Sequence, residues 1–356
     1  MIDSTRSHAR GFSLIELMVA MAIGLFGVIV MMQVYVSSES SKRNTTSGAD
    51  AMNEGIMAIY ALQRDVRMAG FGIADARLMG CDVLLRTGVT LNAMAPVTIN
   101  HASIPAGDAN TDTLLVVYAT TSTTTQGDKV IAATGVQTPS MFADDDWVIQ
   151  AVIQAIDIAV ISAACADTLV LDQVDTVTAT PSTLTLASAT PLGVGNTLFN
   201  LGPGPLPPKI IAYAIRGGNL TQCDYSTQNC GAAGSAGDAT VWVPVASNIV
   251  SLRAQYGRDT SAAGSMLRMA VADTYDQTTP TTACTWMRVP AVRLALVARS
   301  AQAAAAATAA APVWEGSATN PINLTGNTAW QNYRYKVFQT VIPVRNITWM
   351  EAVAGC

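Results

Sequence analysis

The sequence predicts an α+β fold, in which a long hydrophobic N-terminal α-helix precedes a globular domain of antiparallel β-sheet, arranged as one sheet or two. Three observations support this fold class. The chain is apolar and uncharged from Leu17 to Val36, apolar residues then recur at helical spacing, and the residues beyond 72 have strand-like patterns with turn residues between them.

The apolar run from Leu17 to Val36 is the first element. As a helix it is about 30 Å long, which matches the hydrocarbon core of a bilayer. The short polar segment before it ends in Gly11, so a cut after this small residue would leave the helix on the mature chain, unlike the cut of an ordinary secretory signal. We expect a leader peptide at 1–11 and a membrane-spanning helix at 12–36.

The helix is expected to continue out of the membrane over residues 37–71. Four apolar residues in this part share one helical face that would pack on the globular domain: Met52, Ile56, Ile59 and Val66. Gly70 or Gly72 marks the expected end, because glycine readily adopts the left-handed conformation that closes helices. The β-rich globular domain then spans 72–356.

Short strands are predicted throughout that domain. The strand-like runs are 113–119, 167–174, 250–256 and 292–296. In the last two, apolar and polar residues alternate, which is typical of half-buried strands. Gly217 and Gly218 lie between two strand-like halves and predict an antiparallel hairpin. Pro343 predicts an edge strand or a bulge. The Pro- and Gly-rich loop at 201–209 would divide the domain into two lobes.

Composition excludes some classes of protein. Of the 356 residues, 50% are hydrophobic, enough for a sizeable core. Only 13% are charged, the formal net charge is -5, and no basic run is longer than Lys42-Arg43. A nucleic-acid partner bound directly is therefore not expected.

The six cysteines indicate disulfides formed in an oxidising compartment, because none lies in a CxxC pair or at metal-ligand spacing. Cys223 and Cys230 are the pair favoured by sequence, since only a polar loop, "DYSTQN", separates them. The other four cysteines allow three connectivities, and the sequence does not choose among them: Cys81, Cys165, Cys284 and Cys356.

The segment "GFSLIELMVAMAIGLFGVIV" resembles the type IV prepilins, whose leader ends in Gly before Phe or Met, with a Glu four residues further on. The resemblance implies that a prepilin peptidase cuts between Gly11 and Phe12 and methylates the new amine of Phe12. The Glu16 carboxylate would then pair with the N-terminal ammonium of a neighbouring subunit, which offsets its burial among apolar helices. Helix 12–36 would form the filament core.

Later segments resemble the PilW minor pilins in the same order along the chain, among them "AYAIRGGNLTQC", "VASNIVSLRAQYGRDT" and "VPAVRLALVARS". This resemblance implies a minor pilin that primes a type IV pilus or sits at its tip, serving twitching motility, adhesion or DNA uptake. Its expected partners are the prepilin peptidase, other minor pilins, the major pilin and a tip adhesin. It would lie in the inner membrane with a periplasmic domain and then in the pilus. Residues 100–191 do not resemble any family that we can identify.

Two other functions fit part of the same pattern. One is a J-like minor pseudopilin of a type II secretion system, and the other is a membrane-anchored protein whose globular domain binds a surface. An enzyme is not expected, because His101 is the only histidine after the leader and lies in a loop. Asp144, Asp145 and Asp146 lack the alternate spacing of a calcium loop, so neither a metal nor a cofactor is expected.

Overall fold

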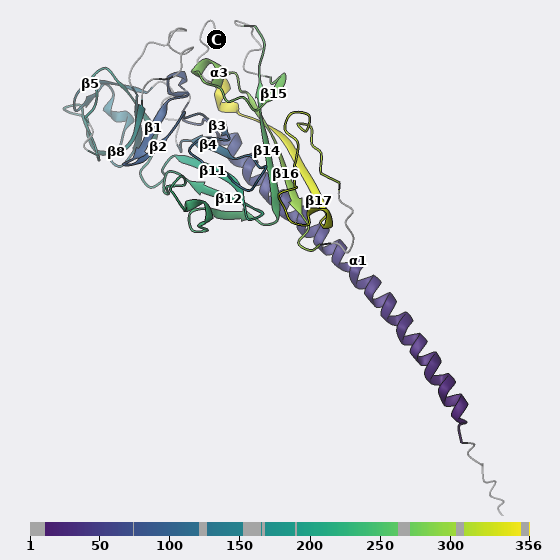
Figure 1. The fold of residues 1–356 in the computed structure, drawn as a ribbon. Coiled ribbons are helices and arrows are strands. Elements are labelled where there is room, and N and C mark those ends of the chain that lie inside the picture. The colour runs from purple at the N-terminus through teal and green to yellow at the C-terminus, as the bar shows by residue number, and fades with distance from the viewer. Residues whose placement is uncertain are drawn as a thin grey trace, which may run out of the picture. The chain divides into compact units, whose positions relative to one another are not determined.

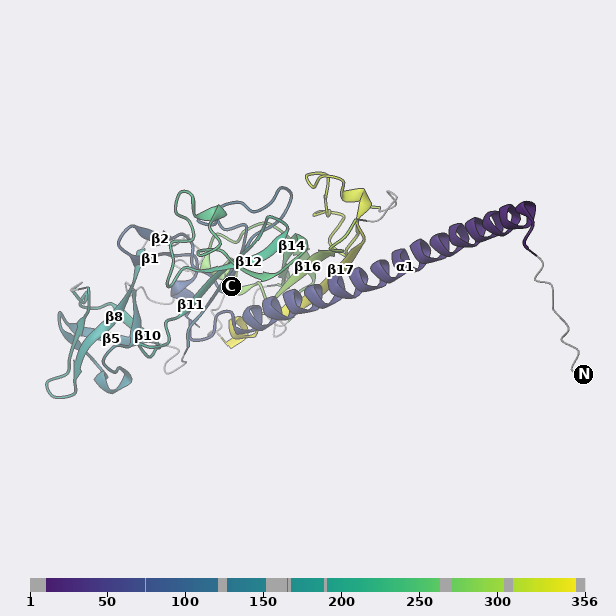
Figure 2. The ribbon, with the colours of Figure 1, turned by 90° about the horizontal axis from the view of Figure 1, so that it is seen from below.

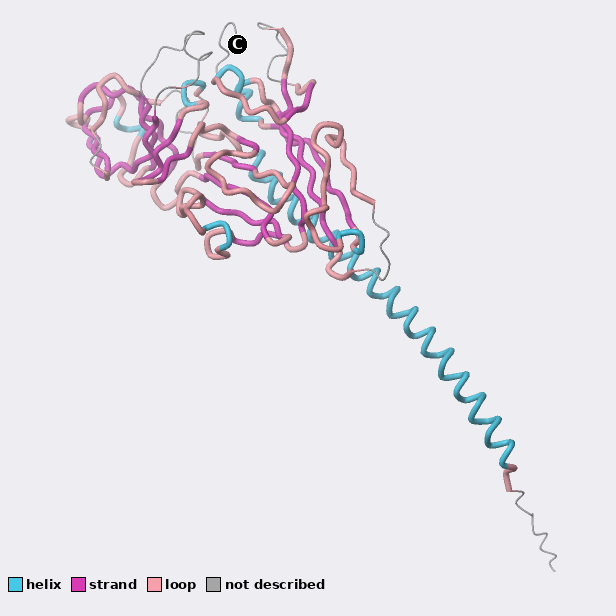
Figure 3. The backbone as a smooth tube through the Cα atoms, in the orientation of Figure 1, coloured by secondary structure: helices cyan, strands magenta, loops and turns pink. Residues whose placement is uncertain are grey.

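The computed structural model describes residues 11–73, 75–120, 127–151, 165, 168–188, 191–262, 271–303, 310–349 and 356. Residues 1–10 of the expected leader lie outside these ranges. The chain divides into two compact units, Met1–Asp50 and Ala51–Cys356, and we call the second the globular unit. Figure 1 labels many of the elements, and Figure 3 shows that strands and loops make up most of the chain after the first helix.

Helix α1 runs from Leu14 to Met68 without interruption, as Figure 2 shows along its length. It ends where the glycine signals predicted, because Gly70 and Gly72 have φ values of 77° and 70°. A residue other than glycine rarely adopts this left-handed conformation, so the helix stops before these positions.

The short helix α3 spans Ala283–Met287 and begins with a capping box at Thr282.

The described strands form three sheets. The first has the order β2-β1-β8-β7-β10-β5-β6, with β9 paired to β8. Its strands are β1 (Asp82–Arg86), β2 (Val89–Leu91), β5 (Asp128–Ala132), β6 (Gly135–Val136), β7 (Trp147–Ala151), β8 (Thr168–Thr178), β9 (Thr183–Leu186) and β10 (Thr197–Gly202).

The second sheet has the order β13-β12-β11-β4-β3 and the third the order β15-β14-β16-β17. The second contains β3 (Val97–Ile99), β4 (Leu114–Tyr118), β11 (Lys209–Arg216), β12 (Asn219–Asp224) and β13 (Val243–Ala246). The third contains β14 (Ile249–Arg258), β15 (Thr274–Asp276), β16 (Ala291–Arg299) and β17 (Tyr335–Pro343).

The predicted fold class is confirmed, with two differences in detail. The described residues form three sheets rather than one or two, and β1 pairs with β8 in parallel while the other recorded pairs are antiparallel. The hairpin at Gly217 and Gly218 is confirmed: both have positive φ, and β11 pairs with β12 from Arg216 and Asn219 onward. Pro343 ends β17, an edge strand, as predicted.

The expected division into two lobes near Leu201 is wrong, since residues 51–356 form one compact unit. A separate small core does exist within it. This satellite core contains Val130, Val136, Phe142, Val148, Val174, Leu184, Leu186, Leu192 and Leu198. All of these residues belong to the segment between β4 and β11, so the satellite core is an insertion in the globular unit rather than half of it.

Strand β14 is buried on both faces, which contradicts the prediction of a half-buried strand. Ser251, Arg253 and Gln255 were expected at the surface and are 0%, 9% and 0% exposed. The reason is that Trp314, Ile322 and Leu324 pack with Val250, Ala295 and Val297 on this side of the third sheet. When a distant part of the chain covers one face of a strand, the residues of the strand itself carry no periodic pattern that indicates this cover.

The buried face of α1 in the globular unit also differs from the prediction. Met52 and Ile56 are each 47% exposed, although Ile59 is partly buried and Val66 is fully buried. The face that packs consists of small and medium residues at helical spacing: Ala51, Gly55, Ala58, Leu62, Val66 and Ala69. Small residues allow the helix backbone to approach the sheets closely, so the larger side chains face outward.

Gly55→Ala is expected to lower the free energy of unfolding of the globular unit by about 1–3 kcal/mol. A Cβ at Gly55 would overlap the ring of Phe338, so the ring must move. Helix propensity alone predicts the opposite sign, about 1 kcal/mol in favour of alanine. Chemical denaturation measures the change.

The matched control is Gly48→Ala on the same helix, where a Cβ meets no heavy atom within 4 Å. Adding Phe338→Leu to Gly55→Ala should recover stability by making room for the methyl group. Equal effects of the two glycine substitutions would contradict the close approach of Phe338.

Candidate functional site

The first part of α1 is an exposed apolar surface. Residues Leu14–Glu39 form a helix long and apolar enough to cross a membrane, with a mean hydropathy of 2.5 and none of it buried against the rest of the chain. Phe12 before it is 83% exposed. Such a continuous apolar surface is unfavourable in water and needs lipid or other helices around it.

Glu16 lies in the first turn of this helix, four residues after Phe12. Its backbone N–H donates to the carbonyl of Ser13 at 3.0 Å, which starts the helix. Its side chain is exposed, and within the described ranges it has neither a hydrogen bond nor an ion pair. The helix N-terminus favours a carboxylate at this position.

A second carboxylate, Asp65, lies on the packed face of α1 and is 0% exposed. It accepts a hydrogen bond from the Tyr213 hydroxyl of β11 at 2.6 Å and a longer one from the Tyr118 hydroxyl of β4 at 3.5 Å. The guanidinium of Arg64, whose side chain is 63% exposed, contributes an ion pair at 2.9 Å. This cluster therefore joins α1 to two neighbouring strands of the second sheet.

The electrostatics of the cluster agree with its geometry. Burial, reinforced by the nearby Asp65 carboxylate, raises the pKa of Tyr118 to about 12 and that of Tyr213 further still. Both hydroxyls therefore stay protonated and able to donate at neutral pH. The Asp65 hydrogen bond and charge raise the pKa of Arg64, so the cation is also retained.

All six cysteines are paired in the structure. Cys223 bonds to Cys230, the pair favoured by sequence. Of the three connectivities left open for the other four, the structure has Cys81 with Cys165 and Cys284 with Cys356, at sequence separations of 84 and 72. Disulfides that close long loops restrict the unfolded chain more than short ones do, so these two are expected to contribute most to stability.

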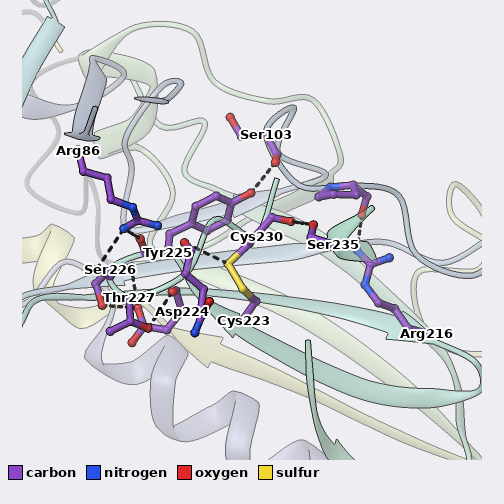
Figure 4. Close-up of a disulfide and its surroundings, with 12 residues drawn as sticks. Arg86, Ser103, Arg216, Cys223, Asp224, Tyr225, Ser226, Thr227, Cys230 and Ser235 are labelled. Atoms are coloured by element: carbon purple, nitrogen blue, oxygen red, sulfur yellow. Dashed lines mark hydrogen bonds between the residues drawn. A yellow bond between two sulfur atoms is a disulfide. The ribbon is translucent and has the colours of Figure 1, made fainter. Parts of the chain in front are cut away.

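The Cys223–Cys230 disulfide holds a loop that contacts two other segments (Figure 4). The guanidinium of Arg86, at the end of β1, donates to the Tyr225 carbonyl at 2.9 Å. The Tyr225 hydroxyl in turn donates to the carbonyl of Ser103. Tyr225 is only 1% exposed and belongs to the core, so this buried residue of the loop joins the first and second sheets.

His101 is buried with both ring nitrogens occupied. Nε2 contacts the carbonyl of Asn92, and Nδ1 accepts a hydrogen bond from the Ser103 N–H at 3.1 Å. The ring is therefore neutral, with its proton on Nε2. Burial lowers the pKa of His101, an effect that the Asn92 hydrogen bond and the Asp82 charge partly oppose. These contacts give the histidine a structural role.

The free energy of unfolding is expected to fall as the pH drops below about 6.5, the ordinary pKa of histidine. The unfolded His101 binds a proton near that pH, whereas the folded one binds it only at a lower pH. The contribution of His101 to the free energy of unfolding is thus complete above pH 6.5, and it is lost as the pH falls through the lowered pKa of the folded state. Thermal unfolding at several pH values, compared between wild type and His101→Gln, measures it. Identical pH profiles would contradict the prediction.

Two family models match the chain. The one described as Type IV Pilus-assembly protein W matches residues 213–346, from β11 to beyond β17, and the one described as Prokaryotic N-terminal methylation motif matches residues 6–32. The chain is therefore similar to type IV pilin-like PilW proteins. No curated protein and no solved structure matches it. Strands β1 to β10 lie outside the PilW match, and the satellite core lies outside it with them.

The pilin-like chain is anchored in the membrane by α1 and has its globular unit in the periplasm or outside the cell. Its two matches describe a structural component of the pilus rather than an enzyme family. They imply interaction with the pilus machinery and with the peptidase that processes the N-terminal motif. Glu16 lies within the matched motif, whereas Asp65 lies in neither matched range.

Sequence reasoning missed Asp65 because a single acid on an amphipathic helix is normally solvated. One signal was present: Asp65 is seven residues after Ala58 and three after Leu62, spacings that share a helical face. Asp65 could have been identified only if the buried face of α1 had been assigned correctly. The larger residues Met52 and Ile56 indicated a different face of the helix.

Proposed function

We propose that this pilin-like protein is a minor pilin that primes assembly of a type IV pilus or sits at its tip. The observation that carries the proposal is the exposed apolar helix with Phe12 and Glu16 at its start, inside the range of the N-terminal methylation motif. A helix with this surface is suited first to a bilayer and then to a bundle of similar helices.

In the proposed mechanism, prepilin peptidase hydrolyses the peptide bond between Gly11 and Phe12. Phe12 then carries the new amino terminus, which is methylated and positively charged. The Glu16 carboxylate pairs with the ammonium of a neighbouring subunit when both enter the filament, because two groups of opposite charge are less costly to bury together than apart. Neighbouring subunits are thereby aligned along the axis.

The globular unit would present its surface to other minor pilins, the major pilin and a tip adhesin. The segment between β4 and β11 has its own core and lies outside the PilW match, so it would provide contacts particular to this chain. The pilus would serve twitching motility, adhesion or DNA uptake, with no direct contact between this chain and nucleic acid.

Mass spectrometry of the N-terminal peptide from sheared surface filaments tests the proposal. We expect this chain in the filaments, at low abundance, beginning with methylated Phe12. A processed chain that stays in the membrane and never enters filaments would favour the pseudopilin of a secretion system instead. An intact leader would refute processing at Gly11 altogether.

The remaining alternative, a binding protein merely anchored by its helix, requires the globular unit to act alone. A fragment beginning at residue 72 is unsuitable, because Ala58, Leu62 and Val66 of α1 are in the main core. The fragment 51–356 corresponds to the compact unit. Restoration of function by this fragment in a deletion strain would favour a binding protein, whereas an inert fragment together with lost pili favours the priming role.

A further inference from the structure

A polar segment of α1 connects the membrane-spanning helix to the globular unit. The apolar span ends at Glu39, and the globular unit begins at Ala51. We call the eleven residues between them, Ser40–Asp50, the link segment. As a helix the link segment is about 16 Å long. Each of its side chains that the structure describes is exposed, so packing does not hold these residues in the helix.

The composition of the link segment is unfavourable for a helix. Serine, threonine, asparagine and aspartate side chains compete for the hydrogen bonds of the helix backbone, and glycine loses the most conformational entropy. Thr45 shows this competition, because its hydroxyl donates to the Ser41 carbonyl at 3.0 Å. The same carbonyl accepts the Thr45 N–H in an α-helix. Residues of these weak types make up eight of the eleven positions: Ser40, Ser41, Asn44, Thr45, Thr46, Ser47, Gly48 and Asp50.

Gly48 weakens the helix at a position where packing does not require a glycine. At Gly55 the ring of Phe338 occupies the place of a Cβ, so close packing accounts for that glycine. A Cβ at Gly48 would meet no heavy atom within 4 Å. An alanine would therefore fit at this position and would strengthen the helix.

The two flanks of the link segment are held in the helix by their surroundings. The span Leu14–Glu39 needs lipid or other helices around it, and in apolar surroundings its backbone groups must pair within the helix. Beyond Ala51, three residues of α1 are 0% exposed in the main core: Ala58, Leu62 and Val66. Such packing supplies most of the stability of helices in proteins. The link segment depends on its own helix propensity instead, and that propensity is low.

We propose that the link segment is a helix–coil hinge, which opens and closes locally while both flanks of α1 stay helical. Opening transfers no apolar core to water, so it lacks the main cost of local unfolding. The open state is a flexible coil, as is typical of chains rich in serine and glycine. The hinge would let the globular unit turn when its anchor passes from a bilayer to a filament. That use rests on the proposed function, whereas the hinge itself does not.

Pulsed electron–electron double resonance on the full-length chain in detergent micelles tests the hinge. All described cysteines are paired, so spin labels attach to added cysteines. The test pair, Val36→Cys with Met52→Cys, spans the link segment, and the control pair, Met52→Cys with Met68→Cys, lies in the packed part of α1. Both pairs are 16 residues apart at exposed positions. In a helix this separation is about 24 Å. We expect a distance distribution at least about twofold wider for the test pair than for the control pair.

Alanine substitutions in the link segment should close the hinge. The variant combines Ser41→Ala, Thr45→Ala, Thr46→Ala and Gly48→Ala, all outside the globular unit. Because alanine has the highest helix propensity, the test-pair distribution should narrow to that of the control pair, which should itself stay unchanged. Equal widths for the two pairs in the native link segment, or a test pair that stays equally wide in the alanine variant, would overturn the proposal. The measurement requires no pilus, so its failure is distinguishable from failure of the proposed function.

Discussion

Glu16→Ala is expected to abolish incorporation of this chain into filaments while membrane insertion stays normal. Insertion depends on the apolar length of Leu14–Glu39, which the substitution leaves intact. During assembly, however, the variant lacks the carboxylate that would neutralise the Phe12 ammonium of a neighbouring subunit. Removing one partner of a buried pair costs about 3–5 kcal/mol, which corresponds to a loss of roughly a hundredfold or more in association.

Two further substitutions separate charge from shape at the same position. Glu16→Gln keeps the size of the side chain without the charge, and we expect it to fail nearly as completely as alanine. Glu16→Lys should be worst, because it places two cations together. Immunoblots of sheared filaments and of membranes, with protease accessibility of the globular unit, measure assembly and insertion separately. Wild-type incorporation of the Gln variant would refute a role for charge pairing.

Features determined by local sequence could be predicted. The apolar length of α1 and its end before Gly70 depend on neighbouring residues, and both agree with the structure. The hairpin at Gly217 and Gly218 is local in the same sense, because the turn itself requires two residues with positive φ. The prepilin motif is likewise a contiguous pattern, which explains why Gly11, Phe12 and Glu16 could be chosen without a structure.

Features that depend on contacts between distant residues could not be predicted. The outer face of β14 is covered by Trp314 and its neighbours, and no pattern within β14 reports that cover. The pairing of Cys81 with Cys165 spans 84 residues, and many chain paths are compatible with such a separation. The Asp65 cluster combines α1 with β4 and β11, so it exists only once the helix packs on the sheet.

The second large effect is expected at that cluster. Tyr213→Phe should lower the free energy of unfolding of the globular unit by about 2–4 kcal/mol. The substitution removes the 2.6 Å donor but leaves the Asp65 carboxylate fully buried. What remains is the longer Tyr118 contact and an ion pair with Arg64, whose exposed side chain is screened by solvent. Urea denaturation of wild type and variant measures the change.

Tyr118→Phe is the matched control, because it removes a hydroxyl of the same kind from the same carboxylate. At 3.5 Å that hydrogen bond is weak, so we expect a loss below about 1 kcal/mol. Asp65→Leu with Tyr213→Phe should cost less than the sum of the two single substitutions, because the double variant buries no unpaired charge. Equal effects of the two tyrosine substitutions, or additive effects of Asp65→Leu and Tyr213→Phe, would mean that general packing rather than the Asp65–Tyr213 hydrogen bond attaches α1 to the sheet.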